Sequence, residues 1–278
     1  MRLIFLFAAA AGLVTGIYAQ DAREIVRKSV ELDQTNWLRM KDYVWVARST
    51  ERHFDSNGKV KSEERKAWET IILDGEPYRR MLEHNGKPLP PDELRKQQEK
   101  LDKNVARLQH ETAEQKQHRL AEYEKQRLKD RAFLREIPDA YELQLTGEAK
   151  VDGHDVWVIV GTPKPGYHPK DRDARALEKI RGKLWVDKSN YQWVRLEAES
   201  TGTISFGLFL ARLNPGAKVV FEQTRVNDEV WLPKHMFLKG TGRLGLLVRV
   251  ATEEDITWND YRKFQVNSKI VGAGSERE

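Results

Sequence analysis

Two hydrophobic periodicities alternate along the chain, one helical and one typical of β-strands. Over residues 21–40 the apolar positions lie near helical spacing, which predicts an amphipathic opening helix that breaks near Thr35. From Tyr43 onward the period is two, as in half-buried strands. Three dipeptides that favour hairpin turns separate the strand-like runs: Asn57-Gly58, Asp74-Gly75 and Asn85-Gly86. We therefore expect a meander of three strands after the opening helix.

A highly charged segment without Gly or Pro follows, from Asp92 to about Arg135. It predicts one long helix or a helical hairpin, inserted over about residues 91–136. Its apolar stripe fades after Leu108 and resumes at Leu120, so the middle of the segment projects into solvent or turns back. Two interpretations stay open: a solvated helix inserted into a β protein, or an arm that binds an envelope protein through about Leu94–Leu134.

Strand-like alternation returns after Pro138 with a hairpin around Asp152-Gly153. A proline-rich loop over 163–169 and a short basic helix over 171–180 come next. About six further strand-like runs follow, and they are Lys183–Asp187, Tyr191–Glu199, Thr203–Ala211, Ala217–Val226, Val230–Lys239 and Gly245–Trp258. In all, about ten or eleven strands are expected without alternating helices, which excludes a doubly wound α/β enzyme fold.

These runs predict an α+β fold with one large antiparallel sheet. Because the strands supply only one strongly apolar face, the sheet is expected to curl into a half-barrel covered by helices. The opening helix and part of the charged segment are the available covers. We expect a single domain over 20–265, with the helical insertion within it, and a flexible C-terminal tail over 266–278.

The first residues have the pattern of a secretory signal peptide. Arg2 supplies the positive region, Leu3–Val14 is almost wholly apolar, and cleavage is expected after Ala19. The alternative is an N-terminal membrane anchor, but the stretch is near the lower limit of about 17 residues for a span. We predict a signal peptide over 1–19 and a mature periplasmic protein without a transmembrane segment.

Composition and motifs argue against catalysis, cofactors and nucleic-acid binding. The chain has no Cys, which excludes disulfides and thiolate sites, and its net charge of only +5 over 278 residues forms no basic patch typical of nucleic-acid binding. The seven His residues lack metal-site spacing, and the G-x-G-x-x-G match at 240–245 precedes a strand rather than a helix. We expect no enzyme, no cofactor and no metal. A hydrolase that uses His154 and His168 is the least favoured reading.

Large apolar side chains on the predicted strands are the strongest functional signal. One interpretation makes them an ordinary sheet core. The other is that the half-barrel leaves a hydrophobic groove for a lipid, a lipoprotein acyl chain or another apolar ligand. The candidate groove residues are Trp45, Trp68, Trp157, Trp185, Phe206, Leu208, Phe221 and Trp231. The alternative function is an envelope interaction or sensing module with a filled core.

One hairpin resembles a known family. Gly182-Lys183-Leu184-Trp185-Val186-Asp187, followed by Trp193-Val194-Arg195-Leu196-Glu197, is similar to a hairpin of the outer-membrane lipoprotein-sorting, LolA-like superfamily, which includes LolA-, LolB- and RseB-type proteins. The resemblance covers about residues 140–258. It implies a periplasmic half-barrel with a helical lid and an apolar cavity, used by relatives to carry acyl chains or to sense envelope components. It implies no catalytic residue.

Overall fold

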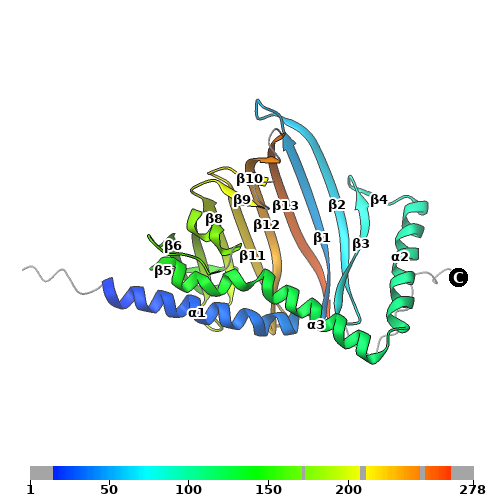
Figure 1. Cartoon of the computed structure of the whole chain (residues 1–278), viewed down its shortest axis with the longest axis horizontal. Helices are drawn as coiled ribbons and strands as arrows, with labels where there is room; N and C mark the ends of the chain where they lie inside the picture. Colours follow the sequence, from blue (N-terminus) through cyan, green and yellow to red (C-terminus); the bar gives the residue numbers. More distant parts are fainter. Residues whose placement is uncertain (1–14, 171–172, 207–210, 245–247, 264–278) are drawn as a thin grey trace, which may run out of the picture.

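A single antiparallel sheet of 13 strands dominates the computed structural model, with helices lying across one end of it (Figure 1). The structure describes residues 15–170, 173–206, 211–244 and 248–263, without the side chains of 15–21, 34, 173, 206 and 244. The main path of the sheet runs β4-β3-β2-β1-β13-β12-β11-β8-β7-β6-β5, and β9 and β10 extend it beside β12. Because β4 and β5 are the ends of this path, the sheet is open. The predicted α+β half-barrel is confirmed.

The strands have the following bounds. They are β1 Tyr43–Phe54, β2 Val60–Leu73, β3 Glu76–His84, β4 Lys87–Pro88, β5 Tyr141–Val151, β6 His154–Pro163, β7 Ile180–Asp187, β8 Trp193–Ser200, β9 Ile204–Phe206, β10 Ala211–Leu213, β11 Lys218–Val226, β12 Val230–Leu244 and β13 Val248–Lys263. The structure has two strands more than the upper expected number of eleven. The predicted run 203–211 contributes both β9 and the start of β10, and Lys87–Pro88 forms the short edge strand β4.

The helices are α1 Thr15–Met40, α2 Pro91–Gln109, α3 Ala113–Asp130, the 3₁₀ helix η1 Ala132–Glu136, the short α4 Ile137–Ala140 and the 3₁₀ helix η2 Asp173–Lys179. The expected break near Thr35 is wrong, since α1 continues to Met40. Asn36, the residue after Thr35, donates a hydrogen bond to the backbone oxygen of Trp231 at 2.7 Å and accepts one from its backbone N–H at 2.8 Å. These two bonds connect the end of α1 to β12. The predicted helix at 171–180 is 3₁₀ over its described part.

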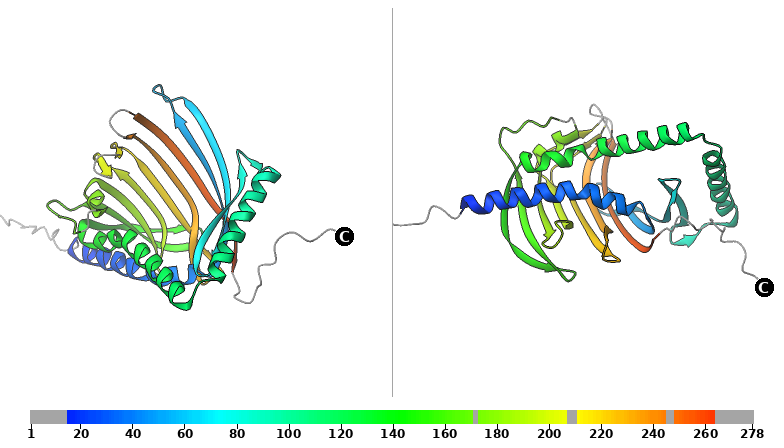
Figure 2. Two further views of the ribbon diagram at one scale, coloured as in Figure 1. Left: turned by 45° about the vertical axis from the view of Figure 1, so that its right-hand side comes forward. Right: turned by 90° about the horizontal axis from the view of Figure 1, so that it is seen from below.

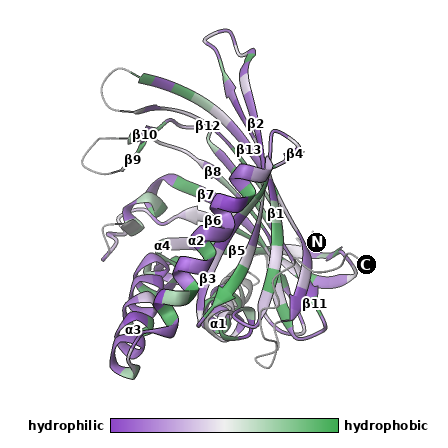
Figure 3. Ribbon diagram, turned by 90° about the vertical axis from the view of Figure 1, so that its right-hand side faces the viewer, coloured by the Kyte–Doolittle hydropathy of each residue, from purple (hydrophilic) through white to green (hydrophobic). Residues whose placement is uncertain are grey.

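The charged segment forms two helices joined by a turn, so it is not one long helix, and the two helices meet at a corner in place of packing side by side as in a hairpin (Figure 2). The chain turns at His110–Thr112, where Thr112 and Gln115 cap α3 through reciprocal side-chain to backbone bonds. In Figure 2, α2 stands beside the β3–β4 edge and α3 runs back along α1. Figure 3 shows both helices to be mostly hydrophilic, as the sequence indicated.

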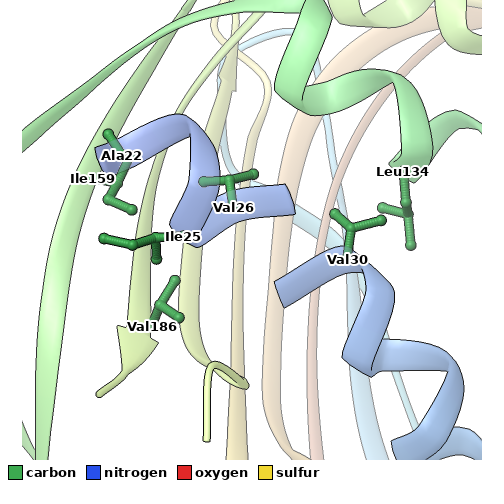
Figure 4. Packing of buried hydrophobic residues seen from close by; sticks show 7 residues of the cluster. All are labelled: Ala22, Ile25, Val26, Val30, Leu134, Ile159 and Val186. Atoms are coloured by element: carbon green, nitrogen blue, oxygen red, sulfur yellow. The ribbon is translucent and has the colours of Figure 1, made fainter. Parts of the chain in front are cut away.

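The opening helix packs by one face onto the β5–β8 part of the sheet. Its buried residues Ala22, Ile25, Val26 and Val30 join Leu134, Ile159 and Val186 in one cluster (Figure 4). A second cluster lies at the other end of the helix, around Tyr43, Trp45, Ala47, Val230, Leu232 and Ile256. Within the described part of the chain, no helix is long and apolar enough to cross a bilayer. The predicted cleavage site at Ala19 falls within α1, and residues 1–14 lie outside the described part.

Candidate functional site

A row of apolar side chains crosses six neighbouring strands at one level of the sheet. Residues that lie directly opposite each other in an antiparallel pair share a face. The register pairs the following residues in succession from β6 to β13: Ile159, Leu184, Leu196, Phe221, Met236 and Ile256. We call these six residues the apolar row. Because Ile159 and Leu184 pack with the buried residues of α1, the row lies on the face that carries this helix.

The helices cover the row only at its ends. Ile159 and Leu184 belong to the cluster under α1, and Met236 and Ile256 belong to the cluster around Tyr43. Leu196 and Phe221 in the middle are half-buried and belong to none of the four buried clusters formed by described residues. In Figure 1, α1 and α3 cross the lower ends of the strands and leave the upper part of the sheet without a helix over it. The middle of the row is therefore apolar sheet face without a helical cover.

A second row lies on the same face, two residues further along each strand. Its residues are small or apolar on β6 to β12 and acidic on the strands that follow. From β6 to β12 it consists of Gly161, Gly182, Ala198, Val219 and Leu238. Gly182 avoids a tight contact there, since an added Cβ would lie 3.1 Å from the backbone oxygen of Glu197. Because Gly161, Gly182 and Ala198 have little or no side chain, nothing large projects from the sheet beside Leu184 and Leu196.

Beyond Leu238 the same row continues with three carboxylates, Glu254, Glu51 and Glu64, on β13, β1 and β2. We call these three residues the acidic row. Glu64 bonds Lys66 and His84, at 2.7 and 3.0 Å. Burial, and after it the charge of Glu51, raise the pKa of Glu254. The face thus offers an apolar centre with a negative border on one side.

The structure separates the candidate residues predicted from the sequence into two groups. Trp157 packs with the cluster under α1, while Trp45 and Trp68 belong to the cluster around Tyr43. Phe221 is a member of the apolar row. These four therefore border or form the helix-bearing face.

The remaining candidates do not join them. Trp185 alternates with Leu184 and Val186, so it lies on the opposite face, where it packs with Val156, Val194 and Trp231. Trp231 is buried in that same cluster. The side chain of Phe206 and the whole of Leu208 lie outside the described part of the chain. As ligand contacts, all eight candidates stay predictions.

The histidines singled out in the sequence are not grouped. His154 Nδ1 lies 3.0 Å from Asp187 Oδ2, and the His154 ring stands 4.7 Å from the ring of Trp231. Asp187 is almost fully buried and accepts backbone bonds from Ser189 and Asn190, so His154 supports a turn. His168 is exposed in the proline-rich loop. Among the described residues, no group of three or more His, Asp or Glu could hold a metal ion.

Sequence reasoning missed most of the apolar row. Leu184 and Leu196 stood in the hairpin motif and Met236 in a predicted strand, but none was a candidate. The period-two pattern of 193–199 and 217–226 indicates which residues of each strand share a face. It does not show that Leu196 lies opposite Phe221, because that depends on strand order and register.

Comparisons with known proteins give similarity in fold alone. No protein-family model matches the chain, and no curated protein matches it. Among solved structures it is similar to a DUF1329 family protein from Desulfovibrio piger, with 14% identity, a TM-score of 0.34, and 91% of this chain and 95% of that chain covered.

Two further structures are similar at comparable levels. A putative outer membrane lipoprotein-sorting protein domain from Vibrio parahaemolyticus has 12% identity and a TM-score of 0.34, covering 88% of this chain and 95% of its own. A LolA superfamily protein from Nitrosomonas europaea has 12% identity and a TM-score of 0.30, covering 88% and 93%.

Proposed function

We propose that this chain is a periplasmic, non-enzymatic binding protein that holds an apolar ligand, such as the acyl chain of a lipid or lipoprotein, against the apolar row. The observation that carries the proposal is the uncovered middle of the row around Leu196 and Phe221. A filled core would leave these two side chains packed under a helix, as Ile159 and Val186 are under α1. The signal peptide over 1–19 and the single domain over 20–265 are parts of the same proposal.

The dimensions of the apolar row suit an acyl chain. Ile159 and Ile256 at the two ends of the row are buried, so the half-buried part runs over four strands, from Leu184 to Met236. Neighbouring strands lie about 4.8 Å apart, so this part is about 14 Å long. One acyl chain spans half of the roughly 30 Å hydrocarbon core of a bilayer, about 15 Å. Each buried CH₂ contributes about 0.8 kcal/mol, so a chain of this length binds tightly without a catalytic or metal group.

Paired substitutions on one strand test the proposal. Phe221→Asn places an amide in the middle of the row, whereas Val220→Asn places it on the opposite face, because successive strand residues alternate. Val220 is also half-buried, so the two variants have a similar structural cost. We expect Phe221→Asn to weaken binding of dansyl-undecanoic acid by about tenfold or more, from the loss of a contact worth about 1.5–3 kcal/mol.

The readout is a fluorescence titration, with circular dichroism to show that both variants are folded. Val220→Asn is expected to bind the fatty acid like the wild type. Equal affinity of all three proteins, or no uptake by the wild type, would overturn the proposal.

A further inference from the structure

Three arginines lie side by side at the upper ends of β10, β12 and β13. The register places Arg212 opposite Arg243, and Arg243 opposite Arg249, so all three share one face. All three are exposed, and neither Arg243 nor Arg249 forms an ion pair or hydrogen bond with a described residue. Like charges directly opposite each other on a sheet destabilise it. Repulsion between these like charges therefore destabilises the free protein, and an anionic partner bound there would relieve the repulsion.

The other face of the same strand ends is apolar. Gly242 lies between Leu213 and Val250, and Val248 is the next residue of β13 on that face. An added Cβ on Gly240 would lie 3.0 Å from the side chain of Leu213, which shows that Leu213 covers this face. Val248 is 57% exposed, one of four large hydrophobic residues exposed among the described ones.

This apolar end is continuous with the apolar row. Met236, Gly240 and Gly242 are an even number of residues apart on an unbroken stretch of β12, so they share the helix-bearing face. The connecting residues 207–210 and 245–247 lie outside the described part, and their sequence adds no charge near the arginines. We call Arg212, Arg243, Arg249, Leu213, Val248 and Val250 the rim. The rim is cationic on its outer face and apolar on the face that leads down to the row.

We propose that the rim docks onto the surface of a bilayer that contains anionic phospholipid. Arginine guanidinium groups bind phosphate in a bidentate manner, and an adjacent apolar edge enters the boundary between headgroups and acyl chains. The complementary charge selects an anionic headgroup, and the amphipathic build of the rim selects a lipid surface over a soluble anion. This inference goes beyond the proposed function, since docking does not require a ligand in the row.

Vesicle flotation with matched variants tests the rim. The probes are vesicles of phosphatidylcholine alone and of phosphatidylcholine mixed with phosphatidylglycerol. The test variant is Arg243→Gln/Arg249→Gln, and the control is Arg135→Gln/Arg175→Gln, which removes two exposed arginines from η1 and η2. Each arginine near an anionic surface changes binding about fivefold, so the test variant should bind the mixed vesicles about thirtyfold more weakly.

The wild type and the control are expected to float with the mixed vesicles and not with phosphatidylcholine alone, and salt should weaken this binding. Arg243→Lys/Arg249→Lys should retain most of it, because the charge is kept. Equal loss in the control, binding that ignores lipid charge, or no binding by the wild type would overturn the proposal. Fatty-acid uptake measured on the same variants separates a failure of docking from a failure of ligand binding.

Discussion

Glu254 is a carboxylate held where its charge is disfavoured. It lies directly opposite Glu51 on β1 and opposite Leu238 on β12, and Lys66 is the nearby cation. Burial comes first and the charge of Glu51 second in raising its pKa, which Lys66 only partly offsets. In the folded protein the proton is therefore bound more tightly than in the unfolded chain, and ionisation above the ordinary value of 4.5 costs stability.

We predict that Glu254→Gln is more stable than the wild type near neutral pH, and that this difference vanishes as the pH falls below about 4.5. The neighbouring Glu253→Gln is the control with the opposite sign. The hydrogen bond from Lys239 lowers the pKa of Glu253, so its carboxylate stabilises the fold above the ordinary pKa and that contribution is lost in acid. Urea unfolding midpoints at about pH 7 and about pH 4 measure both differences. A neutral-pH loss of stability in Glu254→Gln would contradict this account.

Asp187 explains why the hairpin motif ends as it does. Its carboxylate accepts backbone hydrogen bonds from Ser189 and Asn190 at 2.8 and 3.0 Å, which shapes the turn between β7 and β8. The motif therefore encodes a turn and two strand faces, with Leu184 on one face and Trp185 on the other. This is the physical reason that the resemblance indicates the fold and carries no chemistry.

At the scale of elements, Arg119 is the most buried of the charged groups that attach α3 to the sheet. It bonds Asp74 and Glu76 at the β2–β3 turn, at 2.8 and 2.9 Å, and Glu111 in the turn between α2 and α3, at 3.0 Å. Lys116 of the same helix also bonds Asp74. The side chain of Arg119 is only 15% exposed, so its bonds are shielded from water. Next to it, Leu120 packs over Gly75, where an added Cβ would lie 3.0 Å away.

We expect Arg119→Ala to loosen this attachment while the sheet stays folded. Three carboxylates then lose their shared cation, so α3 should separate from the β2–β3 turn more often. Hydrogen exchange should rise at least several-fold over 109–123, with little change in β11–β13. Lys125→Ala is the control, because Lys125 is 75% exposed and its partner among the described residues is Glu122 of its own helix. Equal exchange in both variants would show that Arg119 is not the anchor. That the segment of α2 and α3 binds an envelope protein stays a prediction.

Local patterns predicted most elements, and long-range pairing decided the rest. Each hairpin dipeptide, from Asn57-Gly58 to Asp152-Gly153, lies at a turn between paired strands. The Gly of every one of these dipeptides has positive φ, and so do Asp74, Asn85 and Asp152, as such turns require. Past Thr35, α1 continues where Asn36 bonds the backbone of Trp231, 195 residues away. A single sequence contains no signal for a contact at that distance.

The sequence predicted an apolar site on the sheet, but it identified only some of the residues that form it. Phe221 was expected, but Trp185 and Trp231 pack together on the other face. The candidates were chosen mainly for their large aromatic side chains, whereas the row itself is mostly Leu, Ile and Met. Its members are brought together by the order β6-β7-β8-β11-β12-β13, which is a property of the whole sheet.

At the scale of the whole molecule, the central claim is that the open half-barrel holds an apolar ligand. Native mass spectrometry of the protein purified from the cell envelope, followed by organic extraction and lipid analysis, tests it most directly. We predict a bound species of lipid mass that is released into the organic phase, or one-to-one uptake of added fatty acid by the emptied protein. An apo mass alone, with no uptake of added fatty acid, would contradict the claim and show that the apolar row is only part of the core.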